Sequence, residues 1–89
     1  MNIMAKLDVS NQKLKEFPIG LLYEGINEIN AENNSIEEFP EEIFAFKELT
    51  KVNFSENKIK RIPETIFMLP NLNILYLDNN RINKLLSCY

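Results

Sequence analysis

The sequence predicts a single α/β domain folded as a solenoid, in which short strands form a parallel sheet on one side and short helical turns lie on the other. Three observations predict this class. Asparagines recur every 23 residues, at Asn34, Asn57 and Asn80. Apolar and polar residues alternate before each asparagine, and a proline followed by regularly spaced apolar residues comes after the first two. Such repetition is typical of stacked supersecondary units.

The chain divides into four units under this spacing. We expect one domain over residues 1–89, with units at about 4–25, 26–48, 49–71 and 72–89, the last of them cut short. The first unit is a weaker copy, because Gln12 stands where the others have asparagine. The columns that agree best are Ile26, Leu49 and Leu72; Ile29, Val52 and Leu75; and Ile36, Ile59 and Ile82.

The segment before each asparagine is expected to be a strand. In the third unit, Val52 and Phe54 alternate with Lys51, Asn53 and Ser55. Period-two alternation of β-branched and aromatic residues with polar ones is typical of a strand with one buried face. Strands 23 residues apart are too far along the chain for tight hairpins, so they must return by a crossover and lie parallel.

The segment after each asparagine is expected to form the opposite side. We expect Pro63 to interrupt the backbone ladder and to begin that side, because proline lacks an N–H. Ile66 and Leu69 are three residues apart, which predicts about one turn of helix over 64–69. Pro70 then ends the turn.

The asparagine column predicts a structural role. Backbone groups in a turn between stacked units need hydrogen-bond partners. Asparagine carries donors and an acceptor on a short side chain. We therefore expect Asn34, Asn57 and Asn80 to bond the backbone of their own and adjacent turns. The alternative, exposed turn asparagines, would not require the 23-residue registry.

Taken together, these positions resemble the leucine-rich-repeat family, whose pattern is LxxLxLxxNxIxxIPxxIxxL. The resemblance covers nearly the whole chain. The steps Phe17-Pro18, Phe39-Pro40 and Ile62-Pro63 are similar to those of the family's intracellular 23-residue class. The resemblance implies a non-catalytic module that binds a partner protein through the concave face of its sheet.

The side chains that alternate with the core predict the composition of that face. They form three columns: Lys6, Glu28, Lys51 and Ile74; Asp8, Asn30, Asn53 and Tyr76; Ser10, Glu32, Ser55 and Asp78. By the resemblance, the expected partner-binding residues are Glu28, Asn30, Glu32, Lys51, Asn53, Ser55, Ile74, Tyr76 and Asp78. Ile74 and Tyr76 form an apolar pair, and tyrosine is enriched at interfaces. The alternative is a lone surface aromatic, which is common.

The two ends of the stack lack polar caps, which solenoids need. We expect exposed apolar side chains at both ends, namely Leu7, Val9, Leu14, Phe17 and Leu21 at one and Leu77, Ile82, Leu85 and Leu86 at the other. Each terminal strand is also an unpaired edge. We therefore expect a homo-oligomer or a partner at one uncapped end. The edge 74–78 is favoured, with two copies pairing antiparallel across a two-fold axis.

Composition limits the other function classes. The net charge is −3, which gives no footprint for nucleic acid or anionic membranes. Lys58 to Arg61 is interpreted as a solvated turn. No apolar stretch is long enough for a transmembrane helix. Histidine is absent, so the commonest metal ligand and general base are missing, and we expect no metal, cofactor or small-molecule substrate. The single cysteine, Cys88, favours a cytoplasmic location, because no intramolecular disulfide is possible.

Two alternatives stay open. The chain could be a structural fragment, or a self-assembling unit, of a longer solenoid scaffold. By the same resemblance it could be an enzyme-associated repeat, such as the targeting region of a ubiquitin ligase. Against catalysis, Cys88 has no histidine to activate it. An inert tail thiol is favoured for Cys88 over an intermolecular disulfide.

Overall fold

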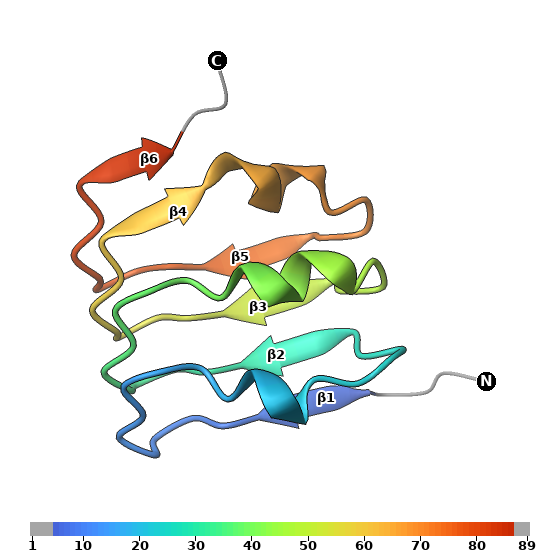
Figure 1. The fold of residues 1–89 in the computed structure, drawn as a ribbon, viewed down its shortest axis with the longest axis horizontal. Coiled ribbons are helices and arrows are strands. Elements are labelled where there is room, and N and C mark those ends of the chain that lie inside the picture. The colour runs from blue at the N-terminus through green and yellow to red at the C-terminus, as the bar shows by residue number, and fades with distance from the viewer. Residues whose placement is uncertain (1–4, 87–89) are drawn as a thin grey trace.

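The computed structural model describes residues 5–86, with residues 84–86 described by their backbone alone. Four parallel strands form the main sheet in the order β1-β2-β3-β5: Lys6–Asp8, Glu28–Asn30, Lys51–Asn53 and Ile74–Tyr76 (Figure 1). A second parallel sheet pairs β4, Arg61–Pro63, with β6, Lys84–Leu86. Three 3-10 helices complete the fold: η1, Ile19–Leu21; η2, Glu41–Ala45; and η3, Glu64–Met68. The short parallel sheet and the short helical turns confirm the expected combination of elements.

The register of the main sheet follows the period of the sequence. Lys6 is the Cα partner of Glu28, which lies beside Lys51, which in turn lies beside Ile74. Residues in one sequence column therefore lie next to one another in space. Parallel strands require a crossover between them. Each of the three crossovers between these strands passes through the turn after the strand and then through a 3-10 helix.

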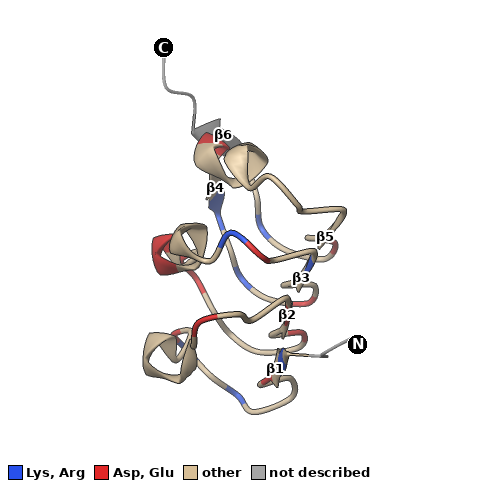
Figure 2. Ribbon diagram, turned by 90° about the vertical axis from the view of Figure 1, so that its right-hand side faces the viewer, with Lys and Arg blue, Asp and Glu red and all other residues tan. Residues whose placement is uncertain are grey.

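The core lies between the sheet and the 3-10 helices, which occupy opposite sides of the molecule in Figure 2. The middle residues of the inner strands, Ile29 and Val52, are buried, as are Ile43 of η2 and Ile66 of η3. Between these layers the ring of Phe54 is completely buried. One face of each strand thus packs against the core, and the other face is in contact with solvent.

The region around Pro63 differs from the sequence-based expectation. We expected Pro63 to interrupt the ladder, but Arg61–Pro63 is a strand that pairs with β6. Proline is tolerated there because β4 is an edge strand, where a missing N–H need not remove a ladder hydrogen bond. The next residue begins η3, and the helix over Glu64–Met68 agrees with the turn expected over 64–69.

The N-terminal end is less exposed than its sequence suggests. We expected Val9 and Phe17 to be exposed there, but they retain only 3% and 6% exposure. The reason is the size of the aromatic side chains. The Phe17 ring reaches the Phe54 ring, with centroids 5.6 Å apart, and so spans more than one strand layer. Leu7 and Leu14 are half-buried, and of the five residues expected at this end only Leu21 is exposed.

The asparagines link successive turns of the stack. Asn57 Nδ2 donates to the backbone oxygens of Ala31 at 2.9 Å, Phe54 at 3.1 Å and Ser55 at 3.1 Å. Asn57 Oδ1 accepts the N–H of Ile36 at 3.0 Å. One buried side chain therefore bonds its own turn and the turn of the preceding layer.

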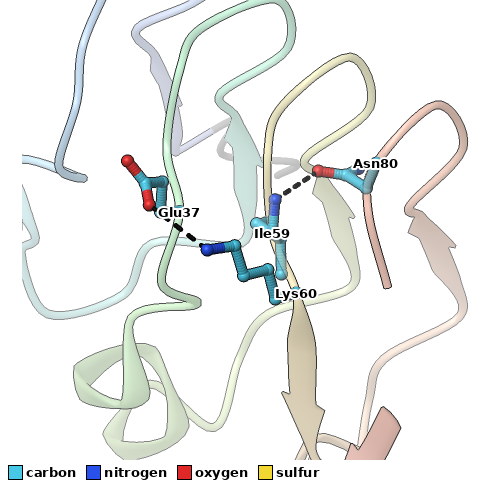
Figure 3. Close-up of polar contacts among 4 residues, drawn as sticks. All are labelled: Glu37, Ile59, Lys60 and Asn80. Carbon is cyan, nitrogen blue, oxygen red and sulfur yellow. Dashed lines mark hydrogen bonds and ion pairs between the residues drawn. The ribbon is translucent and has the colours of Figure 1, made fainter. Parts of the chain in front are cut away.

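Asn34 and Asn80 repeat this pattern. Asn34 Nδ2 donates to the Val9 oxygen at 3.0 Å, and its Oδ1 accepts the N–H of Leu14 at 2.9 Å. Asn80 Oδ1 accepts the N–H of Ile59 at 3.0 Å (Figure 3). We call the column of Asn34, Asn57 and Asn80 the asparagine ladder. It satisfies backbone groups that the stacked turns remove from water.

The residue before each ladder position has a left-handed backbone. Asn33, Glu56 and Asn79 have φ of 59°, 58° and 57°, and Asn11 has 58° at the matching place in the first turn. Asparagine is among the non-glycine residues that tolerate this region best. Glu56 is therefore the one strained member of this column.

We expect Asn57→Ala to lower the free energy of unfolding by about 3 kcal/mol, because buried backbone groups of two turns lose their partner. Urea denaturation followed by circular dichroism measures the change. The matched control is Asn71→Ala, which removes one exposed hydrogen bond, to the Lys47 oxygen. We expect the control to cost about 0.5–1 kcal/mol. Equal losses in the two variants would contradict the role of the ladder.

We expect Glu56→Asn to raise the free energy of unfolding by about 0.5–1 kcal/mol, because asparagine adopts φ of 58° with less strain. The bond that Glu56 accepts from Asn79 Nδ2 need not be lost, because Asn11 accepts the equivalent bond from Asn33. Thermal and urea unfolding check the result. Glu24→Asn, at an exposed position outside the left-handed region, should change stability by less than about 0.5 kcal/mol. A destabilised Glu56→Asn variant would show that strain at this position is unimportant.

Candidate interaction surface

The solvent face of the main sheet is the surface that the sequence singles out. The first and third residues of each strand point away from the core, while the middle residue is buried or half-buried. We call this face the strip. Its two strand columns are Lys6, Glu28, Lys51 and Ile74, and Asp8, Asn30, Asn53 and Tyr76. The structure therefore brings the residues expected in these two columns together on one face.

Many polar atoms of the strip are engaged within the protein. Asp8, Asn30 and Asn53 each accept, through Oδ1, a hydrogen bond from the backbone N–H two residues later, at 3.0, 3.0 and 2.9 Å. Such side-chain bonds fix the turn that follows a strand. These three residues thus have a local structural role, which leaves less of their hydrogen-bonding capacity for a partner.

Asp8 shows the electrostatic effect of this turn. The Ser10 hydroxyl donates to Asp8 Oδ1 at 2.7 Å, and the Ser10 N–H adds a second bond. These bonds lower the pKa of Asp8 below its ordinary value, because they favour the charged carboxylate. The N-terminal part of the strip therefore carries a stable negative charge beside Lys6.

The third column is not an open surface throughout. Ser55 is one of the residues expected to bind a partner, but it is only 4% exposed. Its hydroxyl donates to Asp78 Oδ1, and its backbone N–H is bonded by Asn53. Ser55 therefore faces the next turn and not solvent. Glu32 is half-buried, and its carboxylate accepts a weak bond from Asn53 Nδ2 at 3.5 Å.

The C-terminal part of the strip has a different character. Ile74 and Tyr76 are 39% and 43% exposed. The Lys51 ammonium lies 5.9 Å from the centroid of the Tyr76 ring, within the range of a cation–π contact. We call Lys51, Ile74 and Tyr76 the β5 patch. It combines exposed apolar area with an aromatic ring that a neighbouring cation orients.

The β5 patch adjoins the open end of the sheet. β5 is an edge strand, and no strand within residues 5–86 pairs with its outer side. Ile59 is fully buried, whereas Ile82, one period later, is 39% exposed. Leu77 is half-buried, although Phe54 in the same column is buried. Leu85 and Leu86, also expected at this end, lie outside the residues whose side chains are described, as does Cys88.

Two further features were missed from the sequence. Phe67 and Met68 of η3 are exposed on the helical side, because the turn buries Ile66 and points the next two residues outward. A groove with a volume of about 840 Å³ lies on the flank of the molecule. Phe17, Phe39 and Pro40 line it together with charged side chains of both signs.

The described residues contain neither a metal-binding cluster nor a membrane-spanning helix. Within residues 5–83, no three histidine, cysteine, aspartate or glutamate side chains lie close enough to hold a metal ion. No helix in the described part of the chain is long and apolar enough to cross a membrane.

Comparison with known proteins identifies one similarity. A family model described as a leucine rich repeat matches residues 24–82. No curated protein and no solved structure matches the chain.

Proposed function

We propose that this chain, which belongs to the leucine-rich repeat family, binds a partner protein through the strip of its main sheet. Domains of this family generally mediate protein–protein interaction and are typically non-catalytic. Membership of the family does not identify the partner, because the residues on a shared fold vary with function.

The β5 patch is the observation that carries this proposal. Asp8, Asn30 and Asn53 of the strip are bonded within their own turns. Ile74 and Tyr76, in contrast, remain exposed side by side. Exposed apolar and aromatic groups surrounded by polar residues are typical of the energetically dominant part of an interface. The polar surroundings of the β5 patch are then Glu28, Asn30, Glu32, Asn53 and Asp78. Ser55 holds Asp78 in place by donating a hydrogen bond to it.

Family membership also bears on the arrangement of the repeats and on the location of the protein in the cell. We infer that the layers form a solenoid of about four repeats within one domain, of the intracellular 23-residue class. The matched register of the strands and the asparagine ladder support this inference. A single cysteine among 89 residues supports a cytoplasmic location, because disulfides are rare there.

Self-association through the C-terminal end is a second candidate. The two ends differ in their core columns. Val9 and Phe17 are buried at the first end, although Ile19, Leu21 and Tyr23 of the first layer are exposed, while Ile82 and the β5 patch are exposed at the last end. This asymmetry favours two copies meeting end to end across a two-fold axis, with β5 pairing antiparallel to its counterpart. The alternative, a unit of a longer scaffold, would cover the same end with the next repeat.

We expect Ile74→Ser combined with Tyr76→Ser to abolish capture of the partner by the immobilised chain, because both apolar contacts are lost. The control is Lys6→Ser combined with Asp8→Ser, at the other end of the strip. Proteins retained by the wild type and the control, but lost from the β5 patch variant, are identified by mass spectrometry. Their purified forms are then titrated, and we expect the dissociation constant to rise at least about tenfold. Equal retention by both variants would contradict the proposal.

We expect the wild-type chain to elute as a dimer at tens of micromolar in size-exclusion chromatography with light scattering. Ile82→Lys should give a monomer, because it places a charge in the apolar end face. Leu21→Lys, at the exposed position of the opposite end, should leave the dimer intact. A wild-type monomer at this concentration would overturn self-association without affecting the test of the strip.

A further inference from the structure

Half of the positive charge of the chain is concentrated in two short segments. Residues 57–63 and 80–86 contain five of the ten lysines and arginines and no aspartate or glutamate. They are Lys58, Lys60, Arg61, Arg81 and Lys84. The chain as a whole carries a net charge of −3. From the sequence alone we interpreted only the first segment, as a solvated turn.

The structure places the two segments beside each other. β4 and β6 pair in parallel, and Arg61 is the Cα partner of Lys84. The Arg81 N–H donates to the Ile59 oxygen at 3.0 Å, and the Asn83 N–H donates to the Lys60 oxygen at 3.1 Å. We call Lys58, Lys60, Arg61, Arg81 and Lys84 the basic flank. Figure 2 shows blue at β4, on the side of the molecule away from the strip.

Arg61 and Arg81 of the basic flank are exposed. Lys60 Nζ lies 3.8 Å from Glu37 Oε1 (Figure 3). Both side chains are more than half exposed, so the pair contributes little.

The extent of the basic flank indicates the kind of ligand. One period before Lys60 and Arg61, the same columns hold Glu37 and Glu38. The positive surface therefore covers two layers of the stack and ends at an acidic one. A nucleic acid duplex carries one negative charge per about 1.7 Å of its axis. A duplex that followed the stack would bring its phosphates close to Glu37 and Glu38, which would repel them. A short acidic segment can end before these glutamates.

We propose that the basic flank docks an acidic segment of a partner protein, rich in aspartate and glutamate. The segment lies along β4 and β6, and its carboxylates neutralise Arg61 and Arg81. Charge complementarity of this kind mainly provides specificity and a fast association rate. The flank is a second contact surface, separate from the strip, and does not depend on the β5 patch.

The test uses the full chain and a fluorescein-labelled poly-glutamate peptide of about six residues, roughly 20 Å long when extended. A poly-glutamine peptide of equal length is the uncharged comparison. We expect fluorescence anisotropy to detect binding of the glutamate peptide only, and binding to weaken with added salt. Failure of the glutamate peptide to bind at low salt would overturn the proposal.

Charge-reversal variants locate the site. Arg61→Glu with Arg81→Glu should raise the dissociation constant at least about tenfold. Lys13→Glu with Lys15→Glu changes the net charge equally in the first layer and should raise it less than about threefold. Circular dichroism checks that each variant is folded. If Arg61→Glu with Arg81→Glu disrupts the fold, Arg61→Gln with Arg81→Gln is used in its place. Equal weakening by both pairs would show a general charge effect and overturn the proposal.

Two further measurements complete the test. A single-stranded DNA with the same number of charges should compete weakly, and competition as strong as that of the peptide would refute a protein ligand. The variant with Ile74→Ser and Tyr76→Ser should bind the glutamate peptide as the wild type does. Failure of the strip as an interface and failure of the basic flank are thereby distinguishable.

Discussion

Backbone groups in the turns between the layers cannot all reach water, and the asparagine ladder supplies their hydrogen-bond partners. Asn57 alone bonds the backbone of residues 31, 36, 54 and 55. Because these bonds cross from one layer to the next, they fix the distance and the rotation between layers. The register of the strands follows from this constraint, and with it the columns that face solvent. The asparagine ladder thereby positions both the strip and the basic flank.

The repeated backbone is regular, but the side chains that it exposes are not. Asp8, Asn30 and Asn53 use their side chains to close their own turns. The last strand carries Tyr76 at the corresponding position, and the ring lies in solvent near the Lys51 ammonium. Equivalent positions thus separate into residues that maintain the fold and residues free to contact another molecule. The binding that we propose for the strip rests on this departure from the repeat and not on the repeat itself.

Charge is distributed unevenly over the same frame. Glutamates occupy the flank and the η2 turn in the second layer, and cationic residues occupy the flank in the next two. Figure 2 shows red at η2 and blue at β4 on this side of the stack. The net charge of −3 therefore conceals local regions of opposite sign. The β5 patch, which is apolar and aromatic, and the cationic basic flank therefore differ in their chemistry.

The sequence by itself determined the period, the strands of the main sheet and the ladder, because each depends on residue types at fixed spacing. The alternation around Val52 and the recurrence of Asn34, Asn57 and Asn80 were sufficient for these features. Only the tertiary structure decided that Ser55 is buried, that Phe17 closes the first end and that β4 and β6 form a second sheet. These outcomes depend on side-chain size and on contacts between segments more than twenty residues apart. No local pattern encodes such contacts, because the reach of a phenylalanine ring or the pairing of β4 with β6 is set by the neighbouring layer.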